Sequence, residues 1–591
     1  MAALRLGLIR RYLRPHRRTV LQGVAALVVV NLLSVSLPLL VRGVIDDLQD
    51  GFAVSDVLRE AALIVALATL MGGVRLWSRM LVFGVGRQVE ADLKQKIFQH
   101  MLRQEPGWVQ TTGSGEVISR ATSDVENVRR LLGFAVLSLT NTALAYALTL
   151  PAMLTIDPWL SLAAVGLYPL MLLTVRLFGG RMMRQQRRQQ QSLASLSDLV
   201  QEDLSGISAI KIYGQETTER QAFAERNRAY RDDALQLART RSTLFPLLEG
   251  ISSVSLLLLL ALGSGQLESG RLSIGDLVAL ILYVERLVFP TALLGFTLNT
   301  FQTGQVSLER VEELLQRRPR IESPAAPLSA TGRSDAASAT GCGAAIEARN
   351  LTIRYDGADR DALRGLSFNL RPGELVAVVG PVGCGKTTLA RALGRMVEVP
   401  SGQLFLDGRD VTALALEDLR EQVALVPQEG YLFTASLADN LRYGEPDAGQ
   451  ERVEQAAIQA RLEGDIRGFP DGYRTLVGER GITLSGGQRQ RTALGRALLV
   501  EAPLLVLDDA LASVDNNTAA EILASVRRQN DRTVLMISHQ LSAAAACDRI
   551  LVLEDGHLVQ QGHHRDLVAQ SGTYRRLWER EQAEQQLSRA A

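Results

Sequence analysis

The chain has 591 residues, enough for several domains of ordinary size. Its net charge is only +1, with 64 basic and 63 acidic residues, which argues against binding of nucleic acid through bulk charge. Hydrophobic residues make up 47% of the chain, which excludes a disordered or collagen-like protein. The three cysteines, Cys342, Cys384 and Cys547, are too few and too scattered for a disulfide framework or a zinc site, and they indicate a reducing compartment.

Long apolar runs before about residue 300 predict membrane-spanning helices, since a helix needs about 20 apolar residues to cross a bilayer. The basic segment ahead of the first run is not a secretory signal, because the run is too long and no small-residue cleavage site closes it. We interpret that segment as an amphipathic helix on the membrane surface. The six predicted spans are about 19–44, 57–83, 132–154, 158–180, 244–267 and 274–299.

Arginine is distributed unevenly around these spans. The N-terminal tail holds six arginines, whereas the loop 45–56 has neither lysine nor arginine. The two long connections, about 84–131 and 181–243, are rich in arginine. The positive-inside rule therefore places both termini and both connections in the cytoplasm, and predicts a multi-pass protein of the inner (cytoplasmic) membrane.

Both long connections are predicted to be helices that continue out of the bilayer. Each contains a predicted break, at 106–115 (PGWVQTTGSG) and at 206–214 (GISAIKIYG). Two long helices joined by a short turn would form a rigid lever; the alternative is a stalk without a partner.

Charged residues within the predicted spans are a second functional signal. Glu249, Glu285 and Arg286 lie within predicted spans. Charge inside a membrane is costly and usually faces a cavity or a partner. The alternatives are a structural Glu–Arg pair, or residues that lie nearer the membrane interface.

After an Ala/Ser/Gly-rich linker at 319–345, the sequence changes character. Residues 375–379 (LVAVV) predict a buried strand, which leads into GPVGCGKTT and then a helical pattern, the context of a P-loop. Backbone N–H groups of such a loop converge on phosphate oxygens at a helix N-terminus. We expect Lys386 to reach the β/γ-phosphates and Thr387 to bind Mg²⁺. The residues expected to hold the nucleotide in this segment are Gly380, Val382, Gly383, Cys384, Gly385, Lys386, Thr387 and Thr388.

A second apolar strand, residues 504–507 (LLVL), ends in Asp508, about 120 residues after the P-loop. An apolar strand followed by aspartate is typical of a Walker B motif, in which the carboxylate holds Mg²⁺, usually through water. We expect the Asp508 carboxylate to hold Mg²⁺ beside the P-loop strand.

Between these motifs, residues 484–491 read LSGGQRQR, and here the sequence closely resembles the ATP-binding cassette (ABC) transporters, whose signature motif is LSGGQ. Tyr355 stands 25 residues before Gly380, where the family has an aromatic residue that stacks on adenine. Gln428 matches the glutamine of the family's Q-loop, near Mg²⁺ and the contact with the membrane domain. His539, in MISHQLS, matches the switch histidine that senses the γ-phosphate.

Two further segments carry the resemblance. Residues 513–515 (SVD) match the family's D-loop, and residues 478–481 (GERG) resemble a loop specific to exporters. Six spans with two long cytoplasmic connections match the exporter half of the superfamily, so the resemblance covers the whole chain. It implies an all-α six-helix transmembrane domain (1–318) with long cytoplasmic extensions, an α/β P-loop ATPase domain (346–580) and a tail (581–591).

The resemblance also implies a dimer that binds ATP and Mg²⁺. In this family two nucleotide-binding domains pair head to tail, and each ATP lies between the P-loop of one and the signature of the other. A chain with one cassette is therefore a half-transporter. The signature residues expected to close on the partner's γ-phosphate are Ser485, Gly486, Gly487 and Gln488.

One residue departs from the family pattern. After Asp508 the family normally has glutamate, the general base that polarises the attacking water, whereas this chain has Asp509. Aspartate is one methylene shorter, and a misplacement of about 1 Å can cost on the order of 10²-fold in rate. We predict that the chain's own site binds ATP tightly and hydrolyses it slowly, as in one subunit of heterodimeric exporters. The alternative is a homodimer with two aspartate sites.

The sequence thus predicts an exporter of a hydrophobic or amphiphilic substrate, drug-like or lipid, with Asp509, His539 and Gln428 as catalytic residues and no nucleic-acid partner. Turns near Gly113 and Ile210 would carry closure of the ATPase domains to the spans. The residues expected to line the substrate cavity are Glu249, Glu285, Arg286 and Asn141. The alternatives are a homodimeric exporter of lipid or peptide, an ATP-gated membrane protein that is not a pump, a soluble ABC ATPase and an importer.

Overall fold

The structure is a computed structural model that describes residues 2–49, 54–327, 343–478, 484–528 and 532–590. It divides into two compact units, which are treated separately below. The first comprises Met1–Leu102 and Thr112–Arg317, and the second comprises Arg103–Thr111 and Arg318–Ala591. Residues 328–342 of the predicted linker, with Cys342, and residues 479–481 of the GERG segment lie outside the described residues.

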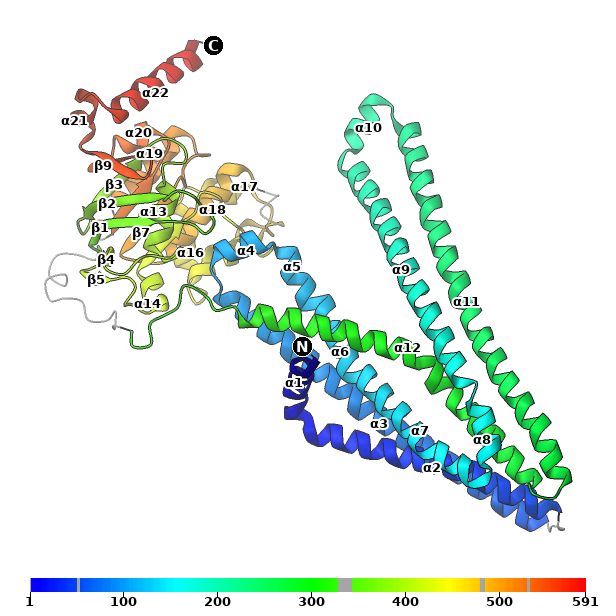
Figure 1. The fold of residues 1–591 in the computed structure, drawn as a ribbon. Coiled ribbons are helices and arrows are strands. Elements are labelled where there is room, and N and C mark those ends of the chain that lie inside the picture. Colours follow the sequence, from blue (N-terminus) through cyan, green and yellow to red (C-terminus); the bar gives the residue numbers. More distant parts are fainter. Residues whose placement is uncertain (1, 50–53, 328–342, 479–483, 529–531, 591) are drawn as a thin grey trace. The chain divides into compact units, whose positions relative to one another are not determined.

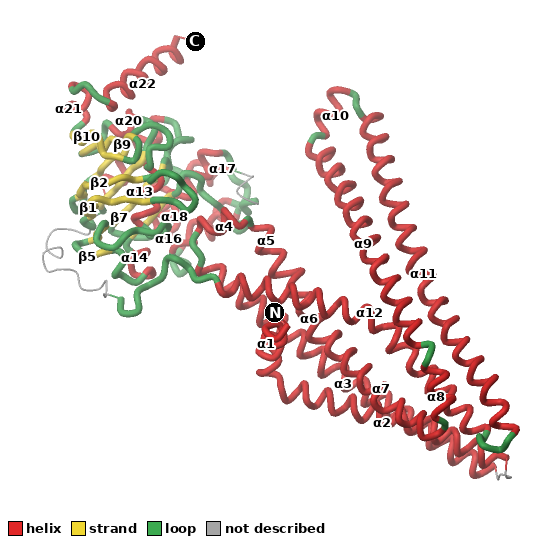
Figure 2. Tube along the Cα trace, in the orientation of Figure 1, coloured by secondary structure: helices red, strands yellow, loops and turns green. Residues whose placement is uncertain are grey.

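The first unit is built of helices alone in the part that the structure describes (Figures 1 and 2). Six helical stretches are long and apolar enough to cross a membrane, as the sequence predicted. Two short π-helical segments, η2 (Arg120–Asp124) and η3 (Leu131–Ala135), interrupt the third stretch. The helices are α1 (Ala2–Leu13), α2 (Arg17–Gln49), α3 (Val54–Arg103), α5 (Ser114–Ser119), α6 (Val125–Arg130), α7 (Val136–Ile156), α8 (Pro158–Val165), α9 (Tyr168–Ser205), α10 (Ile207–Tyr213), α11 (Glu216–Glu268) and α12 (Ile274–Gln316).

Both predicted breaks in the long connections are confirmed. Helices α9 and α11 run side by side as a long hairpin, with the short helix α10 at its tip (Figure 1). Gly214, with a φ of 62°, ends α10 in the left-handed conformation that glycine adopts without strain. In the first connection, α4 (Pro106–Thr112) is followed by Gly113, with a φ of 79°, before α5 begins.

Polar contacts fix the packing of α2 against α12. Asp46 accepts hydrogen bonds from the Ser273 hydroxyl (2.9 Å) and the Gly275 backbone N–H (3.0 Å) at the start of α12. One helix turn away, Arg42 pairs with Asp276 at 2.9 Å. Further along, the Tyr283 hydroxyl donates to the Val35 carbonyl at 2.6 Å. Hydrogen bonds between helices in lipid add specificity to van der Waals packing, so these contacts help to align the two helices.

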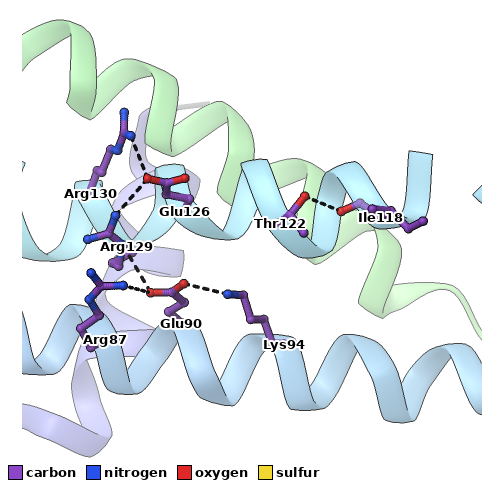
Figure 3. Close-up of polar contacts among 8 residues, drawn as sticks. All are labelled: Arg87, Glu90, Lys94, Ile118, Thr122, Glu126, Arg129 and Arg130. Carbon is purple, nitrogen blue, oxygen red and sulfur yellow. Dashed lines mark hydrogen bonds and ion pairs between the residues drawn. The ribbon is translucent and has the colours of Figure 1, made fainter. Parts of the chain in front are cut away.

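A charge network joins α3 to α6 (Figure 3). Glu90 on α3 lies 2.8 Å from Lys94 and 3.3 Å from Arg129 on α6. Arg129 also reaches Glu126, 3.0 Å away, which bonds Arg130 in turn at 2.7 Å. Several charges sharing partners constrain two helices better than an isolated surface pair does.

The second unit is an α/β domain with two sheets. A six-stranded sheet has the order β10-β9-β3-β8-β7-β6, and a four-stranded antiparallel sheet has the order β2-β1-β4-β5. Strands β3, β8 and β7 are buried along their whole length, as expected for parallel strands covered on both faces. The strands are β1 (Ile346–Ile353), β2 (Leu363–Leu370), β3 (Leu375–Val379), β4 (Leu404–Leu406), β5 (Arg409–Asp410), β6 (Val423–Val426), β7 (Leu504–Asp508), β8 (Thr533–Ile537), β9 (Arg549–Glu554) and β10 (His557–Gly562).

The helices of the second unit flank the sheets and form a separate helical cluster with its own core around Leu441, Val453 and Leu484. The α-helices of the second unit are α4, α13 (Lys386–Leu393), α14 (Leu416–Glu421), α15 (Leu437–Leu441), α16 (Gln450–Gln459), α17 (Glu463–Gly468), α18 (Gly486–Leu499), α19 (Asn516–Arg528), α20 (Leu541–Ala544), α21 (His564–Ala569) and α22 (Thr573–Ala590). Its short 3₁₀ helices are η4 (Arg442–Gly444) and η5 (Gly472–Arg474). The first unit has one further 3₁₀ helix, η1 (Arg14–His16). The two-domain fold class predicted from the sequence is confirmed.

Gly275→Ala tests the close contact of α2 and α12. A Cβ at this position would lie 2.4 Å from the Arg42 carbonyl oxygen, so we expect a loss of about 1–3 kcal/mol in stability. Gly265→Ala on α11 is the matched control, because a Cβ there meets nothing within 4 Å. Thermal unfolding of the two variants in detergent measures the difference; equal stability would contradict the predicted clash.

Candidate ATP-binding site

Four parallel strands deliver the predicted site residues to one edge of the six-stranded sheet. The P-loop follows β3, His539 follows β8, Asp508 ends β7 and Gln428 follows β6. Val378 on β3 pairs with Ile537 on β8, which pairs with Asp508 on β7. Strand β8 lies between the P-loop strand β3 and the Asp508 strand β7. Chain order could not reveal this, since crossover helices allow a later strand to insert between earlier ones.

The P-loop needs its glycines for close backbone approach. A Cβ on Gly380 would lie 2.1 Å from the Leu553 carbonyl oxygen, and one on Gly385 would lie 2.5 Å from that of Ala362. Gly385, with a φ of 102°, begins α13, so the loop's N–H groups stand at a helix N-terminus. At the tip of the loop, Val382 is 89% exposed.

Lys386 is buried within this loop. Its ammonium donates to the carbonyl oxygens of Gly380 and Pro381, each at 2.9 Å, and lies 3.8 Å from the Cys384 sulfur. The Lys386 ammonium is therefore held by neutral carbonyl oxygens of the loop, and none of these three partners is a carboxylate. A positive charge in this setting suits phosphate oxygens bound by the same loop.

The Thr387 hydroxyl donates to Asp508 Oδ1 at 3.1 Å. Burial raises the pKa of the Asp508 carboxyl, the neighbouring Asp509 charge raises it further, and the hydrogen bond from Thr387 opposes both. Hydroxyl and carboxylate oxygens are the hard ligands that Mg²⁺ prefers. In the part of the chain that the structure describes, no group of three or more His, Cys, Asp and Glu could hold a metal. With one hydroxyl and one carboxylate, Thr387 and Asp508 fit a Mg²⁺ ion that also binds phosphate oxygens.

Asp509 adopts a left-handed backbone conformation, with a φ of 51°, and is 7% exposed. Its N–H donates to the Ile537 carbonyl at 3.0 Å, and its Oδ1 accepts from the His539 N–H at 3.4 Å. The short carboxylate is thus directed to the backbone of the predicted switch-histidine segment.

Sequence reasoning missed the contribution of the C-terminal helix α22. Glu581, which was assigned to a tail, accepts hydrogen bonds from the N–H groups of Leu541 (2.7 Å) and Ser542 (3.2 Å). These groups start the short helix α20, directly after the His539 segment. A glutamate at the N-terminus of a helix is favourable, but nothing in the sequence indicated that this one reaches back about forty residues.

Two predicted nucleotide contacts lie at the rim of the site. The Tyr355 hydroxyl lies 3.2 Å from the Thr388 hydroxyl, so the structure brings this aromatic residue to the P-loop helix. Gln428 is exposed beyond the end of β6, with its side chain free of hydrogen bonds within the described residues.

The LSGGQ segment forms the start of α18. Ser485 caps this helix, since its hydroxyl accepts from the Gln488 N–H while Gln488 accepts from the Ser485 N–H. Gln488 also donates to Asp465 at 2.9 Å. Gly486 and Gly487 lie against Ser513, whose carbonyl oxygen would be 2.9 Å from a Cβ on Gly487. No hydrogen bond or ion pair among the described residues joins 484–488 to the P-loop.

The membrane residues predicted to line a cavity are only partly brought together. Arg286 and Asn141 both bond Asn31 on α2, at 3.1 Å each. Glu249 and Glu285 are exposed. Over the described residues, no ion pair joins either glutamate to Arg286, so a Glu–Arg pair within the chain is not formed.

The fold and the site define a class: a multi-pass membrane protein whose helical domain is fused to a P-loop ATPase. Residues 20–291 match the family model for the ABC transporter transmembrane region, and residues 363–512 match the family model for the ABC transporter. The chain belongs to the ABC transporters, in the exporter-type arrangement, and is an ATPase coupled to transmembrane transport.

Several relatives span nearly the whole chain. The chain is 31% identical to the multidrug resistance-like ATP-binding protein MdlA of Escherichia coli strain K12, over 98% of this chain and 97% of that protein. It is 31% identical to the ATP-dependent lipid A-core flippase of Chromohalobacter salexigens, over 96% of each. Among solved structures, a bacterial Atm1-family ABC exporter with ATP bound has a TM-score of 0.77 and 27% identity, covering 96% of this chain and 98% of that one.

Glu581→Ala tests the link from α22 to the His539 segment. Removing the carboxylate leaves two backbone N–H groups without their acceptor, which costs about 1–3 kcal/mol. We expect faster hydrogen exchange at Leu541 and Ser542 and lower ATP turnover. Glu579→Ala is the control, because Glu579 forms an ion pair across the surface of its own helix, with Arg575 at 2.7 Å. Unchanged exchange in the Glu581 variant would contradict the link.

Proposed function

We propose that the chain is one half of a dimeric exporter that uses ATP to move a hydrophobic or amphiphilic substrate out across the cytoplasmic membrane. The observation that carries the proposal is the fusion of six candidate spans to a domain that places P-loop, Asp508, Asp509 and His539 along one sheet edge. The N-terminus and the ATPase domain lie in the cytoplasm under this proposal, in accord with the arginine distribution.

A second subunit completes the site. The LSGGQ segment presents a helix N-terminus that makes no bond to the P-loop of its own chain, so we assign it to the γ-phosphate of ATP on the partner. Helix α10 supports the same view: none of its residues is buried, and Ile212 and Tyr213 are 76% and 75% exposed. Apolar side chains exposed to this degree at the tip of a long lever suit docking on another subunit.

The site residues have these roles under the proposal. Lys386 and the loop N–H groups bind the phosphates, and Tyr355 stacks on the adenine. Mg²⁺, held by Thr387, Asp508 and Gln428 together with phosphate oxygens, neutralises charge that develops on the phosphates. His539 senses the γ-phosphate, and Asp509 orients the attacking water. ATP binding drives closure of the two ATPase domains only because the closed domain pair binds ATP more tightly than the open pair does.

Asp509 weakens the chain's own site. Its carboxylate is shorter than that of glutamate, and it is drawn to the His539 backbone rather than projecting freely. We therefore assign slow hydrolysis to this P-loop and brisk hydrolysis to a partner P-loop followed by glutamate, completed by this chain's LSGGQ. A heterodimer follows from this assignment; a homodimer with two aspartate sites is the alternative.

The names of three relatives bear on the substrate. The proteins that match over nearly the full chain include one named for multidrug resistance and others named as lipid A-core flippases. One name refers to drugs and the other to a lipid; a lipid is amphiphilic, which suits spans that are apolar with few charges.

Lys386→Ala tests the phosphate assignment. The ammonium is the cation held within the P-loop, so its loss should abolish labelling of this chain by a photoreactive ATP analogue. Lys211→Ala, at an exposed residue of α10, is the control and should label normally. Undiminished labelling of the Lys386 variant would show that the phosphates bind elsewhere.

Asp509→Glu tests the weakened site. Restoring the longer carboxylate should raise ATP turnover at this chain's P-loop by about 10²-fold. Asp555→Glu is a matched control, because Asp555 shares the left-handed backbone (φ 47°) but lies in the turn between β9 and β10. Turnover is measured on the complex from native membranes, with its subunits identified. Brisk turnover by a homodimer, little changed by Asp509→Glu, would overturn both the slow site and the heterodimer.

A further inference from the structure

The first turn of α18, the LSGGQ helix, is weak by itself. Its first two residues are Gly486 and Gly487, and glycine loses more backbone freedom in a helix than any other residue. Gly487 has to be glycine, because a Cβ there would lie 2.9 Å from the Ser513 carbonyl oxygen. The same turn carries the N–H groups assigned to the partner's γ-phosphate, and a misplacement of about 1 Å can cost on the order of 10²-fold in rate. Side chains outside the turn therefore have to hold it in place.

Asp465 on α17 holds the start of α18 from one side. Its Oδ1 accepts a hydrogen bond from Gln488 Nε2 at 2.9 Å, and its Oδ2 lies 2.8 Å from Arg491 Nη1. Gln488 and Arg491 are three residues apart and are therefore neighbours on one face of α18. The side chains of Asp465 and Arg491 are only 23% and 18% exposed, so solvent screens this ion pair less than it screens a surface pair. One carboxylate thus ties two residues of the signature helix to α17.

Both partners of Asp465 also contact the backbone at the start of α18. Gln488 Oε1 accepts from the Ser485 N–H at 2.9 Å, and Arg491 Nε donates to the Gly487 carbonyl oxygen at 3.4 Å. The Gln488 side chain is therefore engaged within its own chain, between the residue that caps the helix and Asp465. A restraint applied at Asp465 reaches the glycine turn through two side chains.

The predicted D-loop, residues 513–515, holds the helix from another side. Gln490 Oε1 accepts a hydrogen bond from the Ser513 N–H at 2.8 Å. Gln490 is about 200° around the helix axis from Gln488, so the contacts with Ser513 and with Asp465 act on different faces of α18. The start of the signature helix is thus fixed between α17 and the D-loop of the same chain.

The charge of Asp465 is balanced by Arg491. A helix N-terminus attracts anions, so an unpaired carboxylate bonded to the third residue of the helix would repel a phosphate group bound there. The Arg491 guanidinium, 2.8 Å from Asp465, offsets that negative charge. The ion pair can therefore hold the helix without weakening its attraction for phosphate.

We infer that Asp465 and Arg491 are positioning residues for hydrolysis of the ATP bound by the partner subunit. Together they fix the start of the signature helix and add no net charge to it. The inference deepens the proposed function, on which it rests, because it names the residues that place this chain's LSGGQ segment. Both residues act through Gln488 and the glycine turn.

The test uses the intact complex from native membranes. We expect Asp465→Ala to lower kcat for ATP about tenfold or more, because two side chains lose a charged partner, while KM for ATP stays near its native value. Labelling of each chain by a photoreactive ATP analogue on ice should stay at the native level, since Asp465 lies outside the P-loop. Glu463→Ala is the matched control and should turn over ATP normally, because Glu463 is on the same helix but pairs with Arg467 of that helix at 2.5 Å.

Charge variants test the balance between the two residues. Arg491→Gln leaves the Asp465 carboxylate unpaired and should lower kcat about tenfold, whereas Arg491→Lys keeps the charge and should retain most of the activity. The double variant Asp465→Asn/Arg491→Gln removes both charges but keeps polar groups, so it should recover much of the activity that Arg491→Gln loses. Thermal unfolding is measured in parallel, and turnover is compared at a temperature at which every variant stays folded and assembled, so lower stability alone does not move the readout.

Native turnover in both Asp465→Ala and Arg491→Gln, an equal loss in Glu463→Ala, or a double variant no more active than Arg491→Gln would each overturn the inference. If Asp465→Ala fails to assemble, Arg491→Gln and the double variant decide the question. These measurements follow hydrolysis alone. A native complex that hydrolyses ATP and responds to the variants as expected, but moves no substrate, would instead count against the proposed export function.

Discussion

Parallel pairing of β3, β8, β7 and β6 is the constraint on which the ATPase half of this molecule depends. Parallel strands end at a common edge, so every segment that leaves a strand there meets its neighbours. The P-loop, the His539 segment, the two aspartates and Gln428 are far apart in the chain, yet backbone hydrogen bonds fix their order along that edge. The buried strands behind the edge keep it rigid, and the chemistry is left to loops.

The same strand arrangement fixes the position of Asp509. Asp509 occupies a strained backbone position directly after β7, and the neighbouring strand β8 supplies the backbone groups it contacts. These contacts hold the Asp509 carboxylate toward the His539 backbone, which is the basis of the slow hydrolysis proposed for this site. Helix α22 adds a further restraint, since Glu581 holds the segment that follows His539.

The membrane half is governed by a different rule. Backbone groups in lipid must be satisfied within each helix, so specificity comes from the few polar side chains between helices. Asp46, Arg42 and Tyr283 set the register of α2 against α12, and Asn31 lies further along the same helix pair. That register brings Arg286 to Asn31. The same line of contacts between α2 and α12 therefore aligns the two helices and places the Arg286 guanidinium beside Asn31.

Sequence alone determined the two-domain class, the six apolar helices, the breaks at α4 and α10, and the identity of the motif residues. These features depend on local chemistry: apolar length, glycine conformation, and residue types at fixed spacing. The tertiary structure decided that β8 separates β3 from β7, that Glu581 reaches back to α20, and that Arg286 bonds Asn31 rather than a glutamate. Each of these is a contact between residues distant in the chain, and no periodicity or spacing encodes which of many such contacts will form. The sequence identified the charged residues within the spans; the packing of α2 against α12 decided that Arg286 bonds Asn31.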